Sequence, residues 1–423
     1  MKRKISINLG SLILSFSDSM DLVSPGLIQH QQRTAYISWR IGQIAKLSQE
    51  RIMDIFVAAL LHDIGAFSFE EKEALQKFEI DDPEEHCIRG QKILRIIPWL
   101  KNAANLVRYH HTQYQKMNSE KASINLDAQI LHLADFIERK IDREQCILQQ
   151  QRKITQTIQE LTGTHFNPEV VDYFLQLACR EEFWLDLVSP RLYEMLKVYP
   201  FLKVDSDFDD ILKISRLFRN IIDLRSRFTS THSSGVSVAA SLLSQKFGFT
   251  ESEVKMMEVA GNLHDIGKLA IPDHILNKET SLSKDETAIM RSHTYYTYFI
   301  IKQIEGMEQI ARWAAYHHEK LDGSGYPFHC TAAELSISSR IMAVADIFTA
   351  LIENRPYRVG LEKEEVSRIF KHFVENNLID ENIVILLFSN FKEIYNAVMK
   401  KQTETKKFYE KQFEYKIPSG KQK

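Results

Sequence analysis

The chain has 423 residues, of which 44% are hydrophobic and 26% are charged, with a formal net charge of −2. This length favours two or three domains, and the hydrophobic fraction is enough for each of them to bury a core. The nearly neutral charge argues against a general nucleic-acid binder, because no excess of cations can displace the counterions of a phosphate backbone. We therefore expect no nucleic-acid polymer as a partner, and any recognition of phosphate must be local.

The four cysteines form no CxxC pair, so the sequence suggests neither a disulfide framework nor a zinc ribbon.

The apolar run near the N-terminus is broken by polar or small residues, namely Ser6, Asn8, Gly10 and Ser11. No stretch reaches the roughly 18 uninterrupted apolar residues of a membrane span. We expect a cytoplasmic protein that makes no use of a membrane.

Helical periodicity recurs along the chain, with apolar residues spaced by three and four in the windows 51–65, 170–180, 209–224, 254–267 and 340–354. Glycine and proline concentrate where helices should end: Gly65, Pro83, Gly267, Pro272, Gly323, Gly325, Pro327 and Pro356. No pair of alternating strands is convincing. The sequence predicts an all-α fold.

Two prolines, Pro190 and Pro200, flank the expected domain boundary, and residues 163–178 before it still have the pattern of a packed helix. We predict a first domain over residues 1–200 and a second over 201–400, entered by a helix from about Phe208. Residues 401–423 carry many lysines and little apolar content. We expect them to form a basic C-terminal tail that is frayed and solvated.

The same order of histidines and aspartates occurs twice. The first copy is His30, His62, Asp63, His86, His110, His111 and Asp135, and the second is His232, His264, Asp265, His293, His317, His318 and Asp346. The offset between the copies is 202 residues at the first histidine, 207 at the histidine pair and 211 at the last aspartate. Short insertions explain these changes, so the chain is a tandem duplication of a metal-binding helical domain.

The adjacent His264 and Asp265 end an apolar helix, where burial of an unpaired carboxylate would be costly. A metal at the helix end would satisfy both side chains, and the two oxygens of Asp265 could bridge two ions. The nitrogen and oxygen ligands suit Fe, Mn, Ni, Co or Zn with positions open to water. We therefore predict two divalent transition-metal ions as cofactors, rather than a closed structural zinc site.

Three segments of the second copy resemble the HD-GYP domain of the HD phosphohydrolase superfamily over residues 210–400. They are HDIGKLAIPDHILNK from His264, HHEKLDGSGYP from His317 to Pro327, and RIMAVADIFTALIENRPYR from Arg340 to Arg358. The resemblance implies two tandem HD-type helical domains. It also implies a dinuclear metal phosphodiesterase that acts on a cyclic dinucleotide, either cyclic di-GMP or cyclic GMP-AMP.

The resemblance also assigns roles to residues of the second domain. Lys268 corresponds to the lysine that contacts the scissile phosphate, and we expect it to act in catalysis with Asp265. Tyr326 and Arg355 fall where members of the family contact the nucleotide, and Arg358 is a further candidate contact to phosphate. Two ions would activate a bridging water and neutralise the phosphate oxygens, while Lys268 would stabilise the charge that develops on the phosphoryl group.

Two positions depart from the family pattern. Phe228 stands where many members carry a glutamate able to hold a third metal, which favours a two-metal site. Thr297 stands where glycine is frequent, four residues after His293, so we expect some crowding of that helix but no loss of a ligand.

The first copy keeps all seven ligand positions and is a candidate second metal site. It has Ala66 in place of the lysine and Thr112 in place of Glu319, and it has nothing like the GYP segment. We therefore expect a non-catalytic domain with a regulatory, scaffolding or dimerising role, a homodimer being one assembly that this role would produce.

The leading hypothesis is thus that the protein is an enzyme, which hydrolyses a cyclic dinucleotide to the linear dinucleotide and so lowers a second-messenger signal. A catalytically silent sensor of the same ligand is an alternative, although intact Lys268 and seven ligands argue against it. A phosphohydrolase of mononucleotides is another, against which the GYP and RPYR elements argue.

Overall fold

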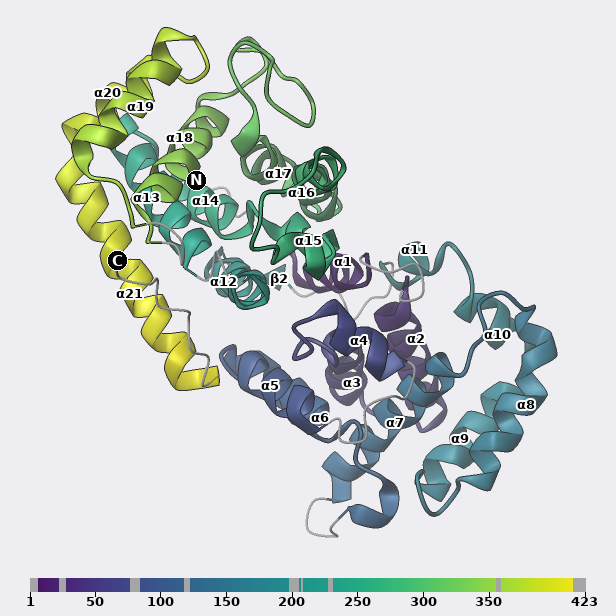
Figure 1. The fold of residues 1–423 in the computed structure, drawn as a ribbon. Helices are drawn as coiled ribbons and strands as arrows, with labels where there is room; N and C mark the ends of the chain where they lie inside the picture. Colours follow the sequence, from purple (N-terminus) through teal and green to yellow (C-terminus); the bar gives the residue numbers. More distant parts are fainter. Residues whose placement is uncertain are drawn as a thin grey trace. The chain divides into compact units, whose positions relative to one another are not determined.

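The computed structural model describes residues 7–22, 28–76, 84–117, 122–197, 205–206, 208–226, 231–354 and 359–413 (Figure 1). The chain divides into two compact units between Asp205 and Ser206, a few residues after the predicted boundary. Asn8–Asp205 form the N-terminal unit, and Ser206–Lys423 form most of the C-terminal unit. Each unit is helical, which confirms the predicted all-α class.

The N-terminal unit carries the first copy of the histidine pattern. Its elements are α1 (Leu9–Asp21), α2 (His30–Ile44), α3 (Gln49–Leu61), α4 (Phe69–Gln76), α5 (Glu84–Leu94), η2 (Pro98–Leu100), α6 (Lys101–Tyr109), η3 (Tyr114–Lys116), α7 (Ala122–Arg139), α8 (Ile147–Glu160), α9 (Pro168–Ala178), α10 (Glu181–Leu187) and α11 (Leu192–Lys197).

The C-terminal unit carries the second copy. Its elements are α12 (Phe208–Arg225), α13 (His232–Phe247), α14 (Glu251–Leu263), η6 (Ile266–Ala270), α15 (Asp273–Leu276), α16 (Lys284–Lys302), α17 (Glu308–Ala315), η7 (Tyr316–His318), α18 (Ile337–Ile352), α19 (Lys363–Glu375), α20 (Glu381–Ser389) and α21 (Phe391–Phe413).

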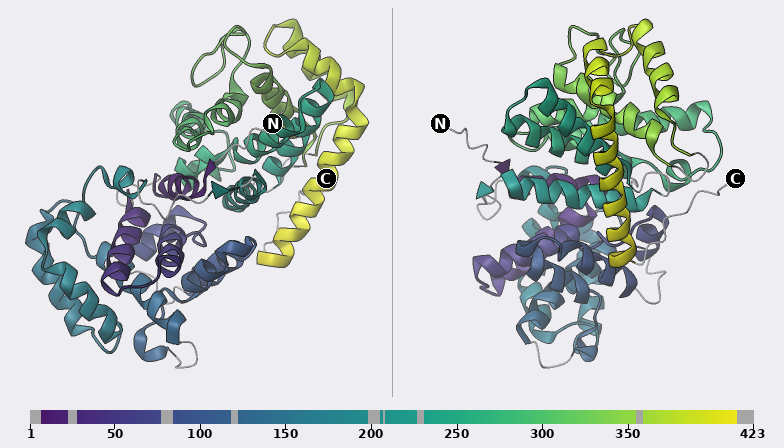
Figure 2. Two further views of the ribbon diagram at one scale, coloured as in Figure 1. Left: turned by 180° about the vertical axis from the view of Figure 1, so that it is seen from behind. Right: turned by 90° about the vertical axis from the view of Figure 1, so that its left-hand side faces the viewer.

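The two units repeat the same packing of five helices. In the N-terminal unit α2 packs on α3 and α7, and α6 packs on α3 and α5. In the C-terminal unit α13 packs on α14 and α18, and α17 packs on α14 and α16 (Figure 2). The duplication seen in the sequence is therefore a duplication of the helical framework that holds the histidines.

Side-chain caps fix where several of these helices begin. Thr250 and Glu253 form a reciprocal capping box at the start of α14, and Ser283 and Glu286 form another at the start of α16. Each box satisfies backbone N–H groups that the first helical turn leaves unpaired. The caps set the register of the two helices that carry His264 and His293.

The expected solvated tail is wrong for residues 401–413, which continue helix α21. Gln402, Thr405 and Tyr409 are buried in line with Ile394 and Val398, at spacings of three and four along one helical face. The α21 helix packs on α13. The sequence hid this face because two of its buried residues are polar. Residues 414–423 lie outside the described residues.

Strands contribute almost nothing to the described part of the chain. Only β1 (Ile7–Asn8) and β2 (Asp205–Ser206) occur there, and they pair with each other.

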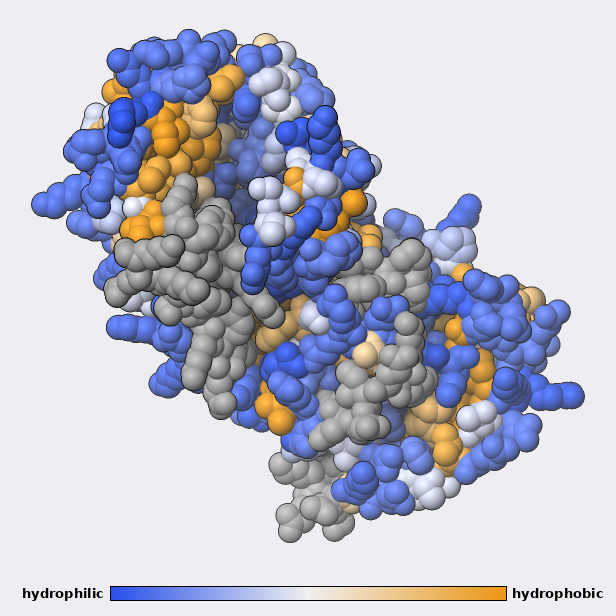
Figure 3. Space-filling view, viewed as in Figure 1, coloured by the Kyte–Doolittle hydropathy of each residue, from blue (hydrophilic) through white to orange (hydrophobic). Residues whose placement is uncertain are grey.

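Within the described residues, no helix combines the length and the apolar character needed to cross a membrane. The face in Figure 3 is mostly hydrophilic, with hydrophobic side chains gathered in separate patches.

Candidate metal centres

The seven predicted ligands of the C-terminal unit converge on one centre. They come from the start of α13, the end of α14, the middle of α16, η7 and the middle of α18, and they are His232, His264, Asp265, His293, His317, His318 and Asp346. All except His318 are buried. The structure thus brings together residues that are up to 114 positions apart in the chain.

Backbone carbonyls orient three of the histidine rings. Nδ1 of His264 donates to the Gly261 carbonyl at 2.9 Å, Nδ1 of His293 to Met290 at 2.7 Å, and Nδ1 of His317 to Ala314 at 2.6 Å. When Nδ1 carries the proton, Nε2 has a lone pair. All three Nε2 lone pairs therefore face the centre. Metal-ligating histidines in proteins are oriented in the same way, by a hydrogen bond from the other ring nitrogen.

Asp265 presents its two oxygens to different histidines. Oδ2 lies 3.2 Å from Nε2 of His264, whereas Oδ1 lies 3.4 Å from Nε2 of His293. Asp346 is placed on the other side of His264, with Oδ1 2.9 Å from Nε2 of His232 and Oδ2 3.7 Å from Nδ1 of His318. With its two oxygens facing different histidines, the Asp265 carboxylate could ligate two cations.

The ligand atoms of the C-terminal centre have the chemistry that a cation requires. Nε2 of His264 is buried without a hydrogen-bond partner, which is costly for a polar atom. Nε2 of His293 lies 3.4 Å from Nε2 of His317. Because both rings donate through Nδ1, these two facing atoms are both acceptors, and a cation between them removes the repulsion.

Burial and neighbouring charge hold two of the ligands, His293 and Asp265, in the protonation states that bind a metal. Burial lowers the pKa of His293 to about 3, so this imidazole is neutral. Burial alone would raise the pKa of Asp265, but His264 and Lys268 hold it well below its usual range. Neutral imidazoles and ionised carboxylates are the forms that ligate transition metals.

Gly267 lets the turn after the His264–Asp265 pair lie directly on helix α16. A Cβ atom at this position would stand 1.9 Å from the carbonyl oxygen of His293. The Thr297 hydroxyl accepts from the Gly267 N–H at 3.0 Å and donates to the His264 carbonyl at 2.9 Å. Threonine, where the family pattern has glycine, thus adds two hydrogen bonds to the turn that holds the centre.

Glu353 contacts the first histidine of the centre, although no sequence motif singles it out. It follows the last residue of α18, is buried, and places Oε2 3.3 Å from Nδ1 of His232. Its other oxygen accepts from Thr231 at 3.0 Å and from Gln402 at 3.1 Å. The first histidine is therefore oriented by a carboxylate, whereas His264, His293 and His317 each use a backbone carbonyl.

Lys268 reaches the centre from η6. Its Nζ donates to Oδ2 of Asp265 at 2.7 Å, and its side chain is 15% exposed. Its ammonium group is therefore partly accessible and lies directly beside Asp265.

The loop that contains Gly325, Tyr326 and Pro327, here called the GYP loop, is hydrogen-bonded to Glu319, the residue after the histidine pair. The buried Glu319 carboxylate accepts from the N–H groups of Phe328 at 2.7 Å and Cys330 at 3.0 Å. A Cβ at Gly325 would lie 2.4 Å from the Cα of Glu319, so only glycine fits there. These contacts bring the Tyr326 ring to 5.0 Å from the His318 ring. Arg355, Arg358 and Phe228 lie outside the described residues.

The N-terminal unit brings its own seven predicted ligands together: His30, His62, Asp63, His86, His110, His111 and Asp135. Asp63 again presents two oxygens, Oδ2 at 3.5 Å from Nε2 of His62 and Oδ1 at 3.6 Å from Nε2 of His86. His62 donates through Nδ1 to the Ala59 carbonyl at 2.8 Å. The ligand geometry of the two centres is therefore alike.

The surroundings of the N-terminal centre differ from those of the C-terminal one. The position of Lys268 is held by the buried Ala66. A different cation enters from α7, where Arg139 places Nη1 3.1 Å from Oδ2 of Asp135. Nδ1 of His30 contacts the buried carboxylate of Glu138, one turn after Asp135. The N-terminal centre thus has an arginine bound to one of its candidate ligands, and it has Ala66 where the C-terminal centre has Lys268.

Comparison with known proteins identifies both units. Residues 27–140 and residues 216–383 each match the family described as the HD domain. The chain is a tandem HD-domain protein of the HD-GYP type. This confirms the family that the sequence motifs indicated.

The relatives of this tandem HD-domain protein include cyclic-dinucleotide enzymes. The 3'3'-cGAMP-specific phosphodiesterase 1 of Vibrio cholerae is 28% identical over 402 residues, which cover 92% of this chain and 93% of that protein. The cyclic di-GMP phosphodiesterase of Thermotoga maritima is 31% identical over 202 residues, covering 47% of this chain and 55% of that protein.

A solved structure extends the likeness to the whole fold. The crystal structure of a cyclic GMP-AMP-specific phosphodiesterase from V. cholerae aligns with a TM-score of 0.64 at 22% identity, covering 92% of this chain and 98% of that one. This likeness concerns the fold of the tandem HD domains.

Proposed function

We propose that the C-terminal HD domain hydrolyses one phosphodiester bond of a cyclic dinucleotide and releases the linear dinucleotide. The observation that carries the proposal is the placement of Asp265, whose two oxygens face different histidines while Lys268 donates to one of these oxygens. A relative that matches over 92% of this chain is named for 3'3'-cGAMP, which makes 3'3'-cyclic GMP-AMP the first substrate to test. Cyclic di-GMP is the second.

Two divalent transition-metal ions, held through the seven ligands of the C-terminal centre, would supply an activated water and neutralise phosphate oxygens. Asp265 joins the two ligand groups. Lys268 offers its ammonium group to the charge that develops on the phosphoryl oxygens. Tyr326 forms the adjacent wall and positions the nucleotide, as we also propose for Arg355 and Arg358.

For the N-terminal HD domain we propose metal binding without catalysis. Its ligand geometry supports a bound ion, while Ala66 offers no charge to a substrate phosphate. Such a metal would contribute folding free energy to the domain. We therefore assign this domain to regulation or assembly, including dimer formation.

The test is hydrolysis of 3'3'-cyclic GMP-AMP and cyclic di-GMP by metal-loaded protein, with products separated by chromatography. Asp265→Asn should abolish turnover, whereas Asp63→Asn, the matched change in the other domain, should retain turnover per folded molecule. Binding of the cyclic dinucleotide without turnover would support a silent sensor instead. Turnover of mononucleotides alone would support a mononucleotide phosphohydrolase. A folded Asp63→Asn protein as inactive as Asp265→Asn would make the first domain part of the catalytic machinery.

A further inference from the structure

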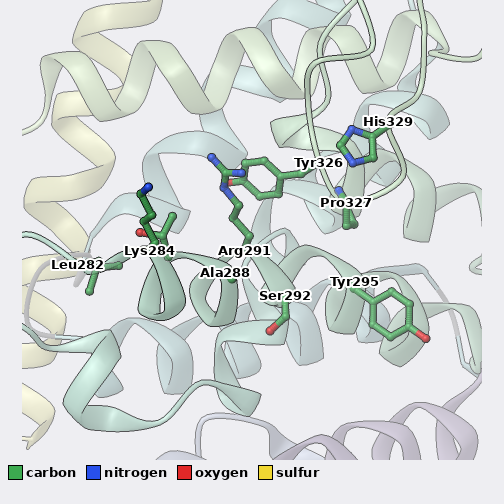
Figure 4. Close-up of a pocket in the computed structure, with 10 residues that line it drawn as sticks. Leu282, Lys284, Ala288, Arg291, Ser292, Tyr295, Tyr326, Pro327 and His329 are labelled. Carbon is green, nitrogen blue, oxygen red and sulfur yellow. The ribbon is translucent and has the colours of Figure 1, made fainter.

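A cavity of about 640 Å³ lies beside the metal centre of the C-terminal domain (Figure 4). One wall is the N-terminal part of α16, with Lys284, Thr287, Arg291 and Tyr295, and the other is the GYP loop, with Tyr326 and Pro327. Lys284, Arg291 and Tyr295 lie at spacings of seven and four, so they share one face of the helix. The cavity thus has aromatic and apolar walls together with two cations.

Arg291 is the cation closest to Tyr326. Its guanidinium carbon lies 4.9 Å from the centroid of the Tyr326 ring, and Figure 4 shows the two side chains against each other. Among the described residues no carboxylate is paired with Arg291, whereas Lys278, in the segment before α16, is paired with Glu286 at 2.6 Å. The charge of Arg291 is therefore available to a ligand in the cavity.

Tyr326 connects the cavity to the metal centre. Its ring lies 5.0 Å from the ring of His318, and its N–H donates to the His318 carbonyl at 3.3 Å. A ligand that reaches from the metal ligands across Tyr326 therefore arrives at Arg291. A molecule with a single phosphate bound at the centre would leave this cation unused.

We propose that the cavity holds the second nucleotide of the cyclic dinucleotide and that Arg291 binds its second, non-scissile phosphate. The proposal rests on the proposed function. A cyclic dinucleotide carries two phosphodiesters in one ring, so when one is at the metals the other remains charged and needs a cation. Guanidinium offers two parallel N–H donors to phosphate oxygens. Leu282, Tyr295 and Pro327 supply apolar surface for the base and ribose.

The experiment compares two diesters in wild type and in Arg291→Ala, Arg291→Lys and Lys302→Ala. The first diester is the cyclic dinucleotide, and the second is bis(4-nitrophenyl) phosphate, which has one phosphate. Lys302 is the matched control, because it lies on the same helix and contacts the ring of Tyr298 at 5.2 Å, outside the cavity. Equilibrium binding of a non-hydrolysable phosphorothioate cyclic dinucleotide is measured alongside.

We expect Arg291→Ala to raise KM for the cyclic dinucleotide about tenfold or more, because it removes a hydrogen bond to a charged group. The analogue should bind correspondingly more weakly. The ratio of kcat/KM between the two diesters should fall by a similar factor, Arg291→Lys should lie between, and Lys302→Ala should match wild type. Equal losses on both diesters, or wild-type KM and binding in Arg291→Ala, would overturn the assignment. Wild-type protein that binds the analogue but turns over neither diester would instead contradict the proposed function.

Discussion

Oε2 of Glu353 lies 3.3 Å from Nδ1 of His232, the ring nitrogen that faces away from Asp346. Burial disfavours the charged imidazole, but the two carboxylates outweigh it and raise the pKa of His232 to about 10. Gln402 of α21 donates to the same Glu353 carboxylate at 3.1 Å. The C-terminal helix therefore supports the first ligand of the metal centre through a single carboxylate.

Replacement of this carboxylate should weaken the metal centre. We predict that Glu353→Ala lowers metal affinity by about ten- to a hundredfold, because the partner of a ligating histidine fixes its orientation and raises its basicity. Metal content measured during dialysis against graded chelator concentrations checks the prediction. Glu393→Gln, which changes an exposed carboxylate paired with Lys246 at 2.7 Å, is the control. If Glu353→Ala retained metal as well as wild type does, the assigned role of Glu353 in orienting His232 would be contradicted.

Lys268 should act on the substrate and not on the metals. Its Nζ contacts Asp265 at 2.7 Å but offers no lone pair while it is protonated. We predict that Lys268→Ala retains the metals and loses turnover by on the order of a hundredfold or more, as expected for one lost electrostatic contact to the transition state. Metal analysis and kcat on the same preparation separate the two effects. Loss of metal together with activity would contradict this role, as would wild-type kcat.

The ligand set was predictable from the sequence because it repeats in register. The supporting residues were not, because they occupy different positions in the two copies. Glu138 stands three residues after Asp135, whereas Glu353 stands seven residues after Asp346, yet each contacts Nδ1 of the first histidine. Only the packed helices show that these two carboxylates are equivalent.

The fold class was equally predictable from the spacing of apolar residues, but the buried face of α21 was not. The buried positions of α21 include Gln402 and Thr405, which a count of apolar residues treats as exposed. Gln402 donates there to the buried Glu353 carboxylate, a tertiary contact that the sequence does not show. Arg291 also went unnoticed, since an arginine on a polar helix face has no distinguishing pattern until the cavity beside it is seen.

The turn after each histidine–aspartate pair should accept only glycine. A Cβ at Gly267 would stand 1.9 Å from the His293 carbonyl, and one at Gly65 would stand 2.0 Å from the His86 carbonyl. We predict that Gly267→Ala destabilises its domain by about 2 kcal/mol or more, as overpacking against backbone does, and also reduces turnover. Gly65→Ala should destabilise the N-terminal domain instead. Thermal unfolding and kcat measured for both variants check this.

Gly42 offers a control for the same substitution. It lies in helix α2, and an added Cβ would meet only side-chain atoms, the nearest at 3.3 Å. Because alanine is the better helix former, Gly42→Ala should leave stability close to wild type. A Gly267→Ala protein as stable and active as Gly42→Ala would show that the turn has room that the structure does not show.

Asp223 should make the stability of the C-terminal domain depend on pH. It is buried on α12, where it accepts from the Ser233 hydroxyl at 2.7 Å and lies 3.5 Å from the Tyr409 hydroxyl. Burial raises its pKa from 3.8 to about 7 in the folded protein, against the opposing effect of Arg219. Between these two values the folded state holds a proton that the unfolded state has released. The free energy of unfolding therefore falls as pH rises through this window and is level above it.

Asp223→Asn removes this titration, so its stability relative to wild type should rise between about pH 4 and pH 7, by about 4 kcal/mol at most. Unfolding of both proteins across that range measures the difference. Tyr409→Phe is the control, because it removes the neighbouring hydroxyl and keeps the carboxyl, so its stability should still fall over the window. A difference between Asp223→Asn and wild type that stays constant with pH, or that shrinks as pH rises, would show that the buried carboxyl does not titrate there.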